Sequence, residues 1–556
     1  MSTTSSQHTV VETDLRRKQA VAFLERPWLS IAAWVDWIIE IYYRLIQEVI
    51  IAAFKPKPPS DGRLEKPFGK IAVIGAGLTG VSSAAHCMAH NFDVVLFEAS
   101  DDVGGIWANV NSTSGLQLNS ILYRFHPGVR WSSSFPRRDE ILGEIRRLWK
   151  EYGLEDRTRL NTKVTSVKRH PSSSDPKAGG HARWTVNTEN PDDAEEVFDA
   201  VIVTVGTCGE PHMIKFPGLD SFRGPVLHSS ELDGDKAKDI DWSGKKVAVI
   251  GGGASAVEAV EAALEKDAKF CSVSVREDKW IIPRNVVVDT LLSMQPFGRE
   301  MPLSFIPEWF LRKFHYRDLE ELSPIDRGVF EGTPIVNDEF LQQIREGRVA
   351  YIRSDVKNVN EHSISLSVRP RGSKPGDKDG AEQQEIEADI LILATGFGRP
   401  SVDFLPKDLF PEEYERPNLY LQNFATEDWS VLMTNSAYTN AIGTVGHFHI
   451  GIYTRILLTL LLDPAARPIP KDMKLWVDVL RFIKRGASGG ALGFFTYMEL
   501  TVWILTFHLF RPDRLRWFFF ILCGWGVDSK FKRKDTPVKG LQRKKVNEQS
   551  LDDEAK

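Results

Sequence analysis

Cysteine is scarce in this 556-residue sequence, which has only Cys87, Cys208, Cys271 and Cys523. None of the four belongs to a Cys-x-x-Cys pair or to a Cys/His cluster with the spacing of metal ligands, which argues against a disulfide framework and a structural zinc site. We therefore predict no metal centre. An excess of one charge is also lacking, because 70 Lys and Arg oppose 75 Asp and Glu and leave a net charge of −5. This balance provides no general attraction to nucleic acid.

Long hydrophobic runs are also few. The mean hydropathy of −0.24 excludes a polytopic membrane protein. The polar residues 1–20 do not resemble the charged and apolar regions of a cleaved signal peptide. With 42% hydrophobic and 26% charged residues, the composition is that of a packed globular protein rather than a disordered one. At about 150 residues per domain, the length predicts roughly three or four domains.

Two similar segments stand out in what the sequence does contain. Residues 70–98 and 245–276 each read as a strand, a glycine-rich turn, a helix and a second strand. Each unit is followed by short strand-like stretches and by a final apolar strand, at 199–206 and 389–396, that ends at glycine. We interpret this as a duplication of architecture. It predicts an α/β fold with two Rossmann-like dinucleotide-binding domains and additional apolar helices at the two ends of the chain.

The first glycine-rich turn is Gly75-Ala-Gly77-Leu-Thr-Gly80. In such a turn the first glycine permits the tight bend, and the second lets the backbone approach a pyrophosphate at the helix N-terminus. The third glycine lets the helix pack closely on the strand. Glu98 ends the second strand, where a carboxylate binds a ribose hydroxyl. We therefore predict that Gly75, Gly77, Gly80 and Glu98 hold a dinucleotide.

The second turn, residues 251–256, reads Gly-Gly-Gly-Ala-Ser-Ala, and its second strand ends in Arg276 with Lys279 close by. Arginine pairs with a ribose 2′-phosphate, which a carboxylate at that position would repel. The two units thus differ at the position that separates FAD or NAD from NADP, so we predict FAD in the first and NADPH in the second. The candidate contacts of the second unit are Gly251, Gly253, Ser255, Ala256, Arg276 and Lys279.

The run Gly104-Gly105-Ile106-Trp107 comes soon after Glu98. Gly105 would let the backbone pass close to a flat ring system, and Trp107 would form a wall beside it. The order of these motifs, with a second turn and a final Ala-Thr-Gly-Phe, resembles the flavin-containing monooxygenases over roughly residues 68–460.

A further segment, 222–232, is similar to the fingerprint that this family shares with Baeyer–Villiger monooxygenases. Phe222, Gly224 and His228 occupy the expected positions, but Leu232 replaces an aromatic residue. The resemblance implies that NADPH reduces FAD and that reduced flavin reacts with O2 to form a C4a-hydroperoxyflavin. One oxygen atom then passes to nitrogen, sulfur or carbon of a small molecule.

The same resemblance suggests roles for other residues. It places Asn119 beside the flavin, and it makes Thr395 and Gly396 a turn where the chain crosses between domains. His228 is either a catalytic residue or a structural histidine whose ring nitrogens are hydrogen-bonded at a domain junction. A helix predicted at 444–462 would point its N-terminus at the flavin.

Other functions fit the same architecture. The residues after Trp107 lack the Tyr-Pro-Gly and Asp of Baeyer–Villiger enzymes, which counts against oxidation of a ketone. A disulfide reductase would need a reactive cysteine pair near the flavin, and Cys87 is solitary. An NADPH quinone reductase stays open as an alternative. The complete dinucleotide motifs argue against a non-catalytic membrane-associated protein.

Tryptophan is concentrated near the ends, since six of the 15 lie in segments 27–54 and 491–525. The first segment has acidic and basic residues every four positions along one helix face, and the second is apolar apart from Glu499 and residues 511–516. With a basic run at 530–545, these segments predict peripheral or monotopic membrane association. A single C-terminal span, a mutually buried helical layer and a dimer interface are the alternatives. We expect an intracellular protein on the cytosolic face of a membrane such as the endoplasmic reticulum, with a lipophilic substrate.

The predicted organisation has six parts. They are 1–67 (polar tail, amphipathic helix and linker), 68–210 (FAD-binding domain, first part), 211–396 (NADPH-binding domain with the fingerprint), 397–480 (return to the FAD-binding domain), 481–529 (apolar membrane-associating segment) and 530–556 (basic to acidic polar tail).

Overall fold

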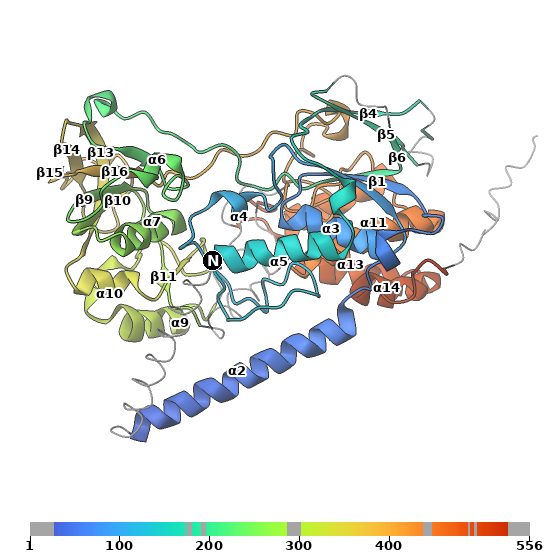
Figure 1. The fold of residues 1–556 in the computed structure, drawn as a ribbon, viewed down its shortest axis with the longest axis horizontal. Coiled ribbons are helices and arrows are strands. Elements are labelled where there is room, and N and C mark those ends of the chain that lie inside the picture. Colours follow the sequence, from blue (N-terminus) through green and yellow to red (C-terminus); the bar gives the residue numbers. More distant parts are fainter. Residues whose placement is uncertain are drawn as a thin grey trace, which may run out of the picture.

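The computed structural model describes residues 27–531 except 172, 175–180, 191–195, 286–287, 289–301, 438–446, 488–489 and 494–496. The polar start of the chain and most of the predicted basic run at 530–545 lie outside the described residues. Two mainly parallel sheets occupy opposite ends of the molecule, and a long helix runs along one side (Figure 1).

The first sheet has five parallel strands in the order β17-β7-β1-β2-β3. Strands β1, β2 and β7 are rich in valine and isoleucine and largely buried on both faces, as expected where helices cover a parallel sheet. Since β17 lies far along the sequence, the chain returns to this sheet after completing the second one. The strands are β1 (Lys70–Ile74), β2 (Asp93–Phe97), β3 (Thr158–Arg159), β7 (Ala200–Val203) and β17 (Val431–Leu432).

Helix α3 (Leu78–Ala89) packs against β1, α5 (Arg138–Glu151) and α11 (His449–Leu462). Every side chain of α3 up to Met88 is buried, so this helix lies within the first domain's core. The helix predicted at 444–462 is confirmed from His449 onward, and its residues 444–446 lie outside the described part.

The second sheet has the order β15-β14-β13-β10-β9-β16-β8. The strands from β13 to β8 run parallel, and β14 and β15 add an antiparallel edge. Helix α7 (Ala254–Glu265) packs on β9 and β10 as α3 does on β1 and β2, so the predicted fold of two Rossmann-like units is confirmed. The strands are β8 (Val226–His228), β9 (Lys246–Ile250), β10 (Phe270–Val275), β13 (Val349–Val359), β14 (Ser363–Val368), β15 (Glu382–Glu387) and β16 (Ile390–Leu393).

Smaller elements surround these sheets. An antiparallel sheet contains β4 (Val164–Arg169), β5 (Trp184–Thr188) and β6 (Val197–Phe198), and a parallel pair joins β11 (Ile281–Ile282) to β12 (Ile335–Val336). Further helices are α4 (Ile106–Asn109), α6 (Asp235–Lys238), α9 (Phe305–Phe310), α10 (Phe340–Arg345) and α12 (Pro470–Ile483).

The helix predicted at 27–54 is confirmed as α2 (Pro27–Phe54), whose side chains are described from Ile41 onward. Two buried side chains one turn apart hold it to the first domain. The hydroxyl of Tyr43 donates to the Ser133 carbonyl at 2.7 Å, and the Gln47 amide accepts from the Trp131 N–H at 2.9 Å. The other side chains from Ile41 to Val49 are exposed, and the apolar ones among them are Ile41, Tyr42, Leu45, Ile46 and Val49.

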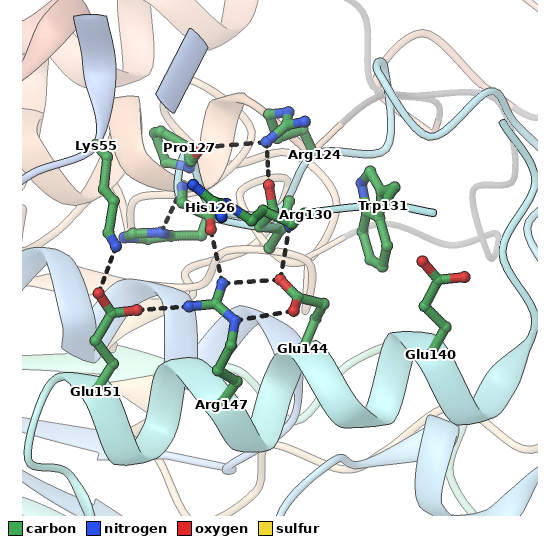
Figure 2. Close-up of polar contacts among 12 residues, drawn as sticks. Lys55, Arg124, His126, Pro127, Arg130, Trp131, Glu140, Glu144, Arg147 and Glu151 are labelled. Atoms are coloured by element: carbon green, nitrogen blue, oxygen red, sulfur yellow. Dashed lines mark hydrogen bonds and ion pairs between the residues drawn. The ribbon is translucent and has the colours of Figure 1, made fainter. Parts of the chain in front are cut away.

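A charged network on α5 fixes the chain that follows α2, as Figure 2 shows. Lys55 pairs with Glu151, and Arg147 binds both Glu144 and Glu151 from the same helix face. The Arg147 guanidinium also donates to the Gly128 carbonyl at 2.6 Å. The network therefore ties the end of α2 and the segment 124–131 to one helix of the first domain.

The apolar C-terminal segment folds onto the first domain as α13 (Tyr497–Leu509) and α14 (Phe518–Cys523). Trp503 and Phe507 of α13 are buried, and their rings are stacked with centroids 4.4 Å apart. The indole of Trp525 donates to the Ala53 carbonyl at 3.0 Å, so this segment touches the end of α2. Among the described residues, no helix has both the length and the apolar character needed to cross a bilayer.

Candidate functional site

The first glycine-rich turn has backbone geometry that glycine alone satisfies. Gly75 has φ +102°, and a Cβ there would lie 2.7 Å from the Thr204 carbonyl oxygen. A Cβ on Gly80 would lie 1.9 Å from the Gly75 carbonyl oxygen. Gly77 precedes the first residue of α3 and faces Gly105, whose Cα would lie 3.5 Å from a Cβ at Gly77. The turn and the Gly104-Gly105 run thus meet through backbone, with no side chain between them.

Glu98 is fixed beside this turn at the end of β2. Its carboxylate accepts hydrogen bonds from the backbone N–H of Ala76 at 2.7 Å and of Ser100 at 2.9 Å, and the side chain is buried. Each carboxylate oxygen has a further lone pair for a sugar hydroxyl. The structure therefore brings together Gly75, Gly77, Gly80 and Glu98, as the sequence predicted.

Trp107 lies in an aromatic cluster that the sequence motifs did not reveal. Its indole N–H donates to the Tyr123 hydroxyl at 3.1 Å. The Tyr123 ring packs edge-on against the His447 ring, with the ring centroids 4.2 Å apart. Burial raises the pKa of Tyr123 and lowers the pKa of His447 well below its usual value, so both groups are neutral at physiological pH. The Gly-Gly-x-Trp run is thus walled by neutral aromatic side chains.

A second set of hydrogen bonds continues from this cluster to α3. His449 lies next to His447, and its ring nitrogen Nε2 is 2.9 Å from the Asn435 side-chain oxygen. The Asn435 amide donates to the Thr79 hydroxyl at 2.9 Å. Two histidines so close to the start of a predicted helix were the available clue, but only the fold shows that they meet Tyr123 and Asn435.

Asn119 is buried in the segment that leads to Tyr123. Its side-chain oxygen accepts from the Ile121 N–H at 2.9 Å, and its carbonyl accepts from the Tyr123 N–H at 3.0 Å. The next residue, Ser120, hydrogen-bonds to Tyr43 of α2. Asn119 is therefore held in one orientation by its own turn, close in the chain to the aromatic cluster.

The second glycine-rich turn is equally constrained. Gly251 has φ +145°, and a Cβ there would lie 2.2 Å from the carbonyl oxygen of Ala394, the residue before Thr395 and Gly396. Ser255 and Ala256 follow in the first turn of α7, and Ala256 is buried in the second core. A cavity opens beside the turn, lined by residues that include Gly251, Gly252, Gly253, Ala256, Lys279 and Tyr351.

Lys279 and Arg276 differ in exposure. The Lys279 ammonium nitrogen would lie 3.9 Å from a Cβ at Gly253, and Glu277 is the carboxylate that acts on its charge. Burial, with Arg327 adding to it, lowers the pKa of Lys279. Arg276 is 71% exposed and only 3.8 Å from Asp355. The structure therefore places one sheltered and one exposed cation at the second turn.

His228 lies at the junction of β8 and β16. Its Nε2 donates to the Gly396 carbonyl at 3.0 Å, while Nδ1 accepts from the Ser230 N–H at 3.2 Å. Burial lowers the pKa of His228, so the neutral ring is retained. Thr395 extends the same junction by donating to the His212 carbonyl. These contacts support the domain-junction interpretation of His228.

Comparison with known proteins decides the family. A model of the flavin-binding monooxygenase-like family matches residues 68–434, a range that contains both glycine-rich turns. The chain belongs to the flavin-binding monooxygenase-like family. The predictions of this family and of a flavin-dependent monooxygenase are thereby confirmed, and FAD and NADPH as the two cofactors agree with it.

Individual relatives and solved structures are consistent with this family. The guinea pig (Cavia porcellus) flavin-containing monooxygenase 5 is 28% identical over 392 residues, covering 63% of this chain and 68% of its own. The mouse (Mus musculus) N-oxide-forming dimethylaniline monooxygenase 4 is 27% identical over 476 residues, covering 77% of each chain. A structure of oxidised steroid monooxygenase bound to NADP has the same fold, with a TM-score of 0.58 and 18% identity over 80% of this chain and 98% of that one.

Proposed function

We propose that this family member uses FAD and NADPH to transfer one oxygen atom from O2 to nitrogen, sulfur or carbon of a lipophilic small molecule. The observation that carries the proposal is the contrast between the two turns. At the first turn a buried carboxylate, Glu98, is held by two backbone amides. At the second, Lys279 and Arg276 supply positive charge instead. Two related folds with opposite charge at this position suit two different dinucleotides.

The first turn fits FAD. The pyrophosphate would lie at the N-terminus of α3, where the backbone approaches closely at Gly77 and Gly105. Glu98 would accept a hydrogen bond from a ribose hydroxyl, and Trp107 and Tyr123 would pack beside the flavin ring system. When bound, the flavin supplies the redox chemistry with NADPH and O2, and the protein supplies binding, orientation and the exclusion of water.

The second turn fits NADPH. Burial lowers the pKa of Lys279 although the charge of Glu277 partly offsets it, so the ammonium is costly to hold unless an anion neutralises it. A phosphate at the N-terminus of α7 would meet both Lys279 and the backbone amides after Gly253. Arg276 can turn onto a ribose 2′-phosphate, because its side chain is 71% exposed and its contact with Asp355, at 3.8 Å, is weak.

Transfer of oxygen to nitrogen or sulfur is favoured over Baeyer–Villiger oxidation of a ketone. The residues after Trp107 lack the Tyr-Pro-Gly and Asp pattern, and a curated relative is named as N-oxide-forming. The steroid monooxygenase likeness, at 18% identity, bears on fold alone. Baeyer–Villiger oxidation and NADPH quinone reduction are the alternatives that the test must separate.

Membrane association is part of this proposal. The side chains of α2 that point away from the first domain include apolar ones, with Leu45 57% and Val49 58% exposed, beside the exposed charges of Arg44 and Glu48. Val502, Leu505 and Leu509 of α13 are exposed as well. The inner faces of these helices are docked on the protein, and their outer faces carry apolar side chains. This arrangement suits contact with the lipid surface rather than a helix that crosses the membrane. This arrangement would place the enzyme at the cytosolic face of a membrane such as the endoplasmic reticulum, where lipophilic substrates collect.

The test is oxidation of NADPH by purified, yellow protein, with and without air. The proposal predicts that N,N-dimethylaniline stimulates NADPH oxidation only when O2 is present and is converted to its N-oxide. Rapid anaerobic turnover with a quinone would establish the reductase alternative. Conversion of a ketone to an ester, with no N-oxide from the amine, would establish the Baeyer–Villiger alternative.

A further inference from the structure

The segment 111–117 of the first domain is hydrogen-bonded to the second domain at several points. It follows α4, on the side of the first domain that faces α7 (Figure 1). The Asn111 amide donates to the Ser229 carbonyl at 2.8 Å, and the Ser112 N–H donates to the Asp233 carboxylate at 2.6 Å. Both acceptors lie at the end of the fingerprint segment or just after it. The fingerprint thus holds the near end of segment 111–117.

Glu258 of α7 holds the far end of this segment. Its carboxylate accepts from the Ser114 hydroxyl at 2.8 Å and from the Gln117 amide nitrogen at 3.1 Å. The Gln117 side-chain oxygen in turn accepts from the Val336 N–H of β12 at 2.9 Å. One carboxylate and one amide therefore join α7, β12 and segment 111–117 in a single network between the domains.

The held segment leads directly to the candidate active site. Asn119 comes two residues after Gln117, and its turn continues to Tyr123 at the Gly-Gly-x-Trp run. Glu258 itself begins the second turn of α7, the helix that opens at the second glycine-rich turn. The contact thus connects the helix of one dinucleotide turn to the loop that carries Asn119.

We propose that Glu258 is a positioning residue, which acts through Ser114 and Gln117 to fix the loop of Asn119 against the second dinucleotide-binding domain. The importance of Asn119 for oxygen transfer rests on the proposed function, whereas the interdomain contact does not. In this arrangement Glu258 acts through its hydrogen bonds to Ser114 and Gln117. Its effect is on how the two domains are spaced.

Protonation of Glu258 acts on this contact. Burial raises the pKa of Glu258 to about 7, and the neighbouring carboxylate of Glu261 adds to the shift. The other charged groups nearby are Glu265, which pairs with Arg137 of the first domain, and Arg284 and Glu339, which face Glu261. The hydrogen bonds from Ser114 and Gln117 lower this pKa, but burial outweighs them, so the folded protein holds the protonated carboxyl more favourably than an exposed one would be held. Keeping this carboxyl buried between the domains is therefore less favourable as the pH rises from 4.5 to about 7.

Hydrogen exchange read by mass spectrometry on the FAD-loaded protein tests the proposal. Glu258→Ala should lower the protection factors of amides in 111–121 by about tenfold, since two hydrogen bonds to a carboxylate are lost. Gln117→Ala should have a similar effect. Combining it with Glu258→Ala should lower the protection factors little further, since both changes break the same contact. Glu261→Gln is the matched control, because Glu261 lies three residues further along α7 and accepts from Asn337 within its own domain. Unchanged protection in Glu258→Ala, or equal loss in Glu261→Gln, would overturn the proposal.

A second variant separates positioning from general stability. Glu258→Gln keeps the shape and mimics the protonated carboxyl, so its protection factors should be independent of pH between about 5 and 7, while those of the wild type fall over that range. In the same FAD-loaded enzyme, Glu258→Ala should raise the KM for NADPH. It should also raise the fraction of oxidised NADPH that yields H2O2 instead of oxygenated product, with the FAD content unchanged. A pH-dependent loss of protection in Glu258→Gln equal to that of the wild type would contradict the proposal. If Glu258→Ala lowers amide protection as expected but the wild-type enzyme transfers no oxygen to a substrate, the positioning role is supported and the proposed function is refuted.

Discussion

Lys484 and Glu499 form an ion pair at 2.7 Å in which both side chains are completely buried. Glu499 is the acid that interrupts the apolar C-terminal segment, and the pair joins α13 to the residue that follows α12. A charge placed here is thus neutralised by protein rather than exposed to lipid. The docking of α13 on the first domain accounts for the position of this acid.

Removal of one partner of this pair is expected to destabilise the protein strongly. Glu499→Gln or Lys484→Met alone should lower the free energy of unfolding by about 3–5 kcal/mol, because the remaining charge stays buried. The double variant Lys484→Met with Glu499→Leu should recover most of that loss, since neither charge remains. Urea unfolding followed by tryptophan fluorescence measures both. Equal losses in the single and double variants would show that the charges are not coupled.

The preference for NADPH over NADH should depend on Arg276 and Lys279. Arg276→Ala should raise the KM for NADPH by roughly 10- to 100-fold and leave the KM for NADH nearly unchanged, because a charge-assisted contact with the 2′-phosphate is lost. Lys279→Ala should raise the KM for both cofactors if its ammonium meets the pyrophosphate. Steady-state kinetics with the two cofactors provide the comparison. An equal effect of Arg276→Ala on both would remove the assignment of Arg276.

FAD retention should depend on the backbone geometry of the first turn. Gly80→Ala places a Cβ 1.9 Å from the Gly75 carbonyl oxygen, so the turn must open and the purified protein should lose its yellow colour. Gly143→Ala in α5 is the control, because a Cβ there meets nothing within 4 Å. That control should keep its FAD and be slightly more stable, since alanine favours a helix. Equal flavin content in the two variants would refute the role of Gly80.

Stability should fall with pH through the titration of Glu258. Its pKa is raised from 4.5 to about 7, so the folded state binds more protons than the unfolded state in that range. The contribution of Glu258 to the free energy of unfolding therefore decreases as pH rises from 4.5 to about 7. In Glu258→Gln this part of the pH dependence should disappear. Urea titrations at several pH values test it, and an unchanged slope in the variant would contradict the assignment.

Membrane binding should depend on the outer face of α2. Leu45→Glu combined with Ile46→Glu should abolish flotation of the purified protein with vesicles that contain phosphatidylcholine and phosphatidylserine. Met213→Glu is a suitable control, because Met213 is also an exposed apolar side chain but lies in the segment between the domains. Flavin content should be normal in both variants. Flotation of the double variant at the wild-type level would disprove lipid contact through α2.

The local motifs were readable from the sequence, but the contacts between distant segments were not. Gly75 and Glu98 belong to one strand–helix–strand unit, so their spacing alone predicted their meeting. Tyr123, His447 and Asn435 come from three separate parts of the chain, and only the packing of α11 against α3 brings them together. Glu258 lies on a helix with several acidic residues, where a solvated charge is the usual interpretation. Its partners Ser114 and Gln117 are in the other domain, which no periodicity in the sequence reveals.

The most direct test of the account is a single turnover experiment with N,N-dimethylaniline, NADPH and O2 enriched in heavy oxygen. The oxygen atom of the N-oxide, read by mass spectrometry, is predicted to come from O2, with one NADPH consumed for each product molecule. Product oxygen that comes from water, or NADPH oxidation that proceeds equally well without O2, would contradict the assignment of this chain as an oxygen-transferring flavoenzyme.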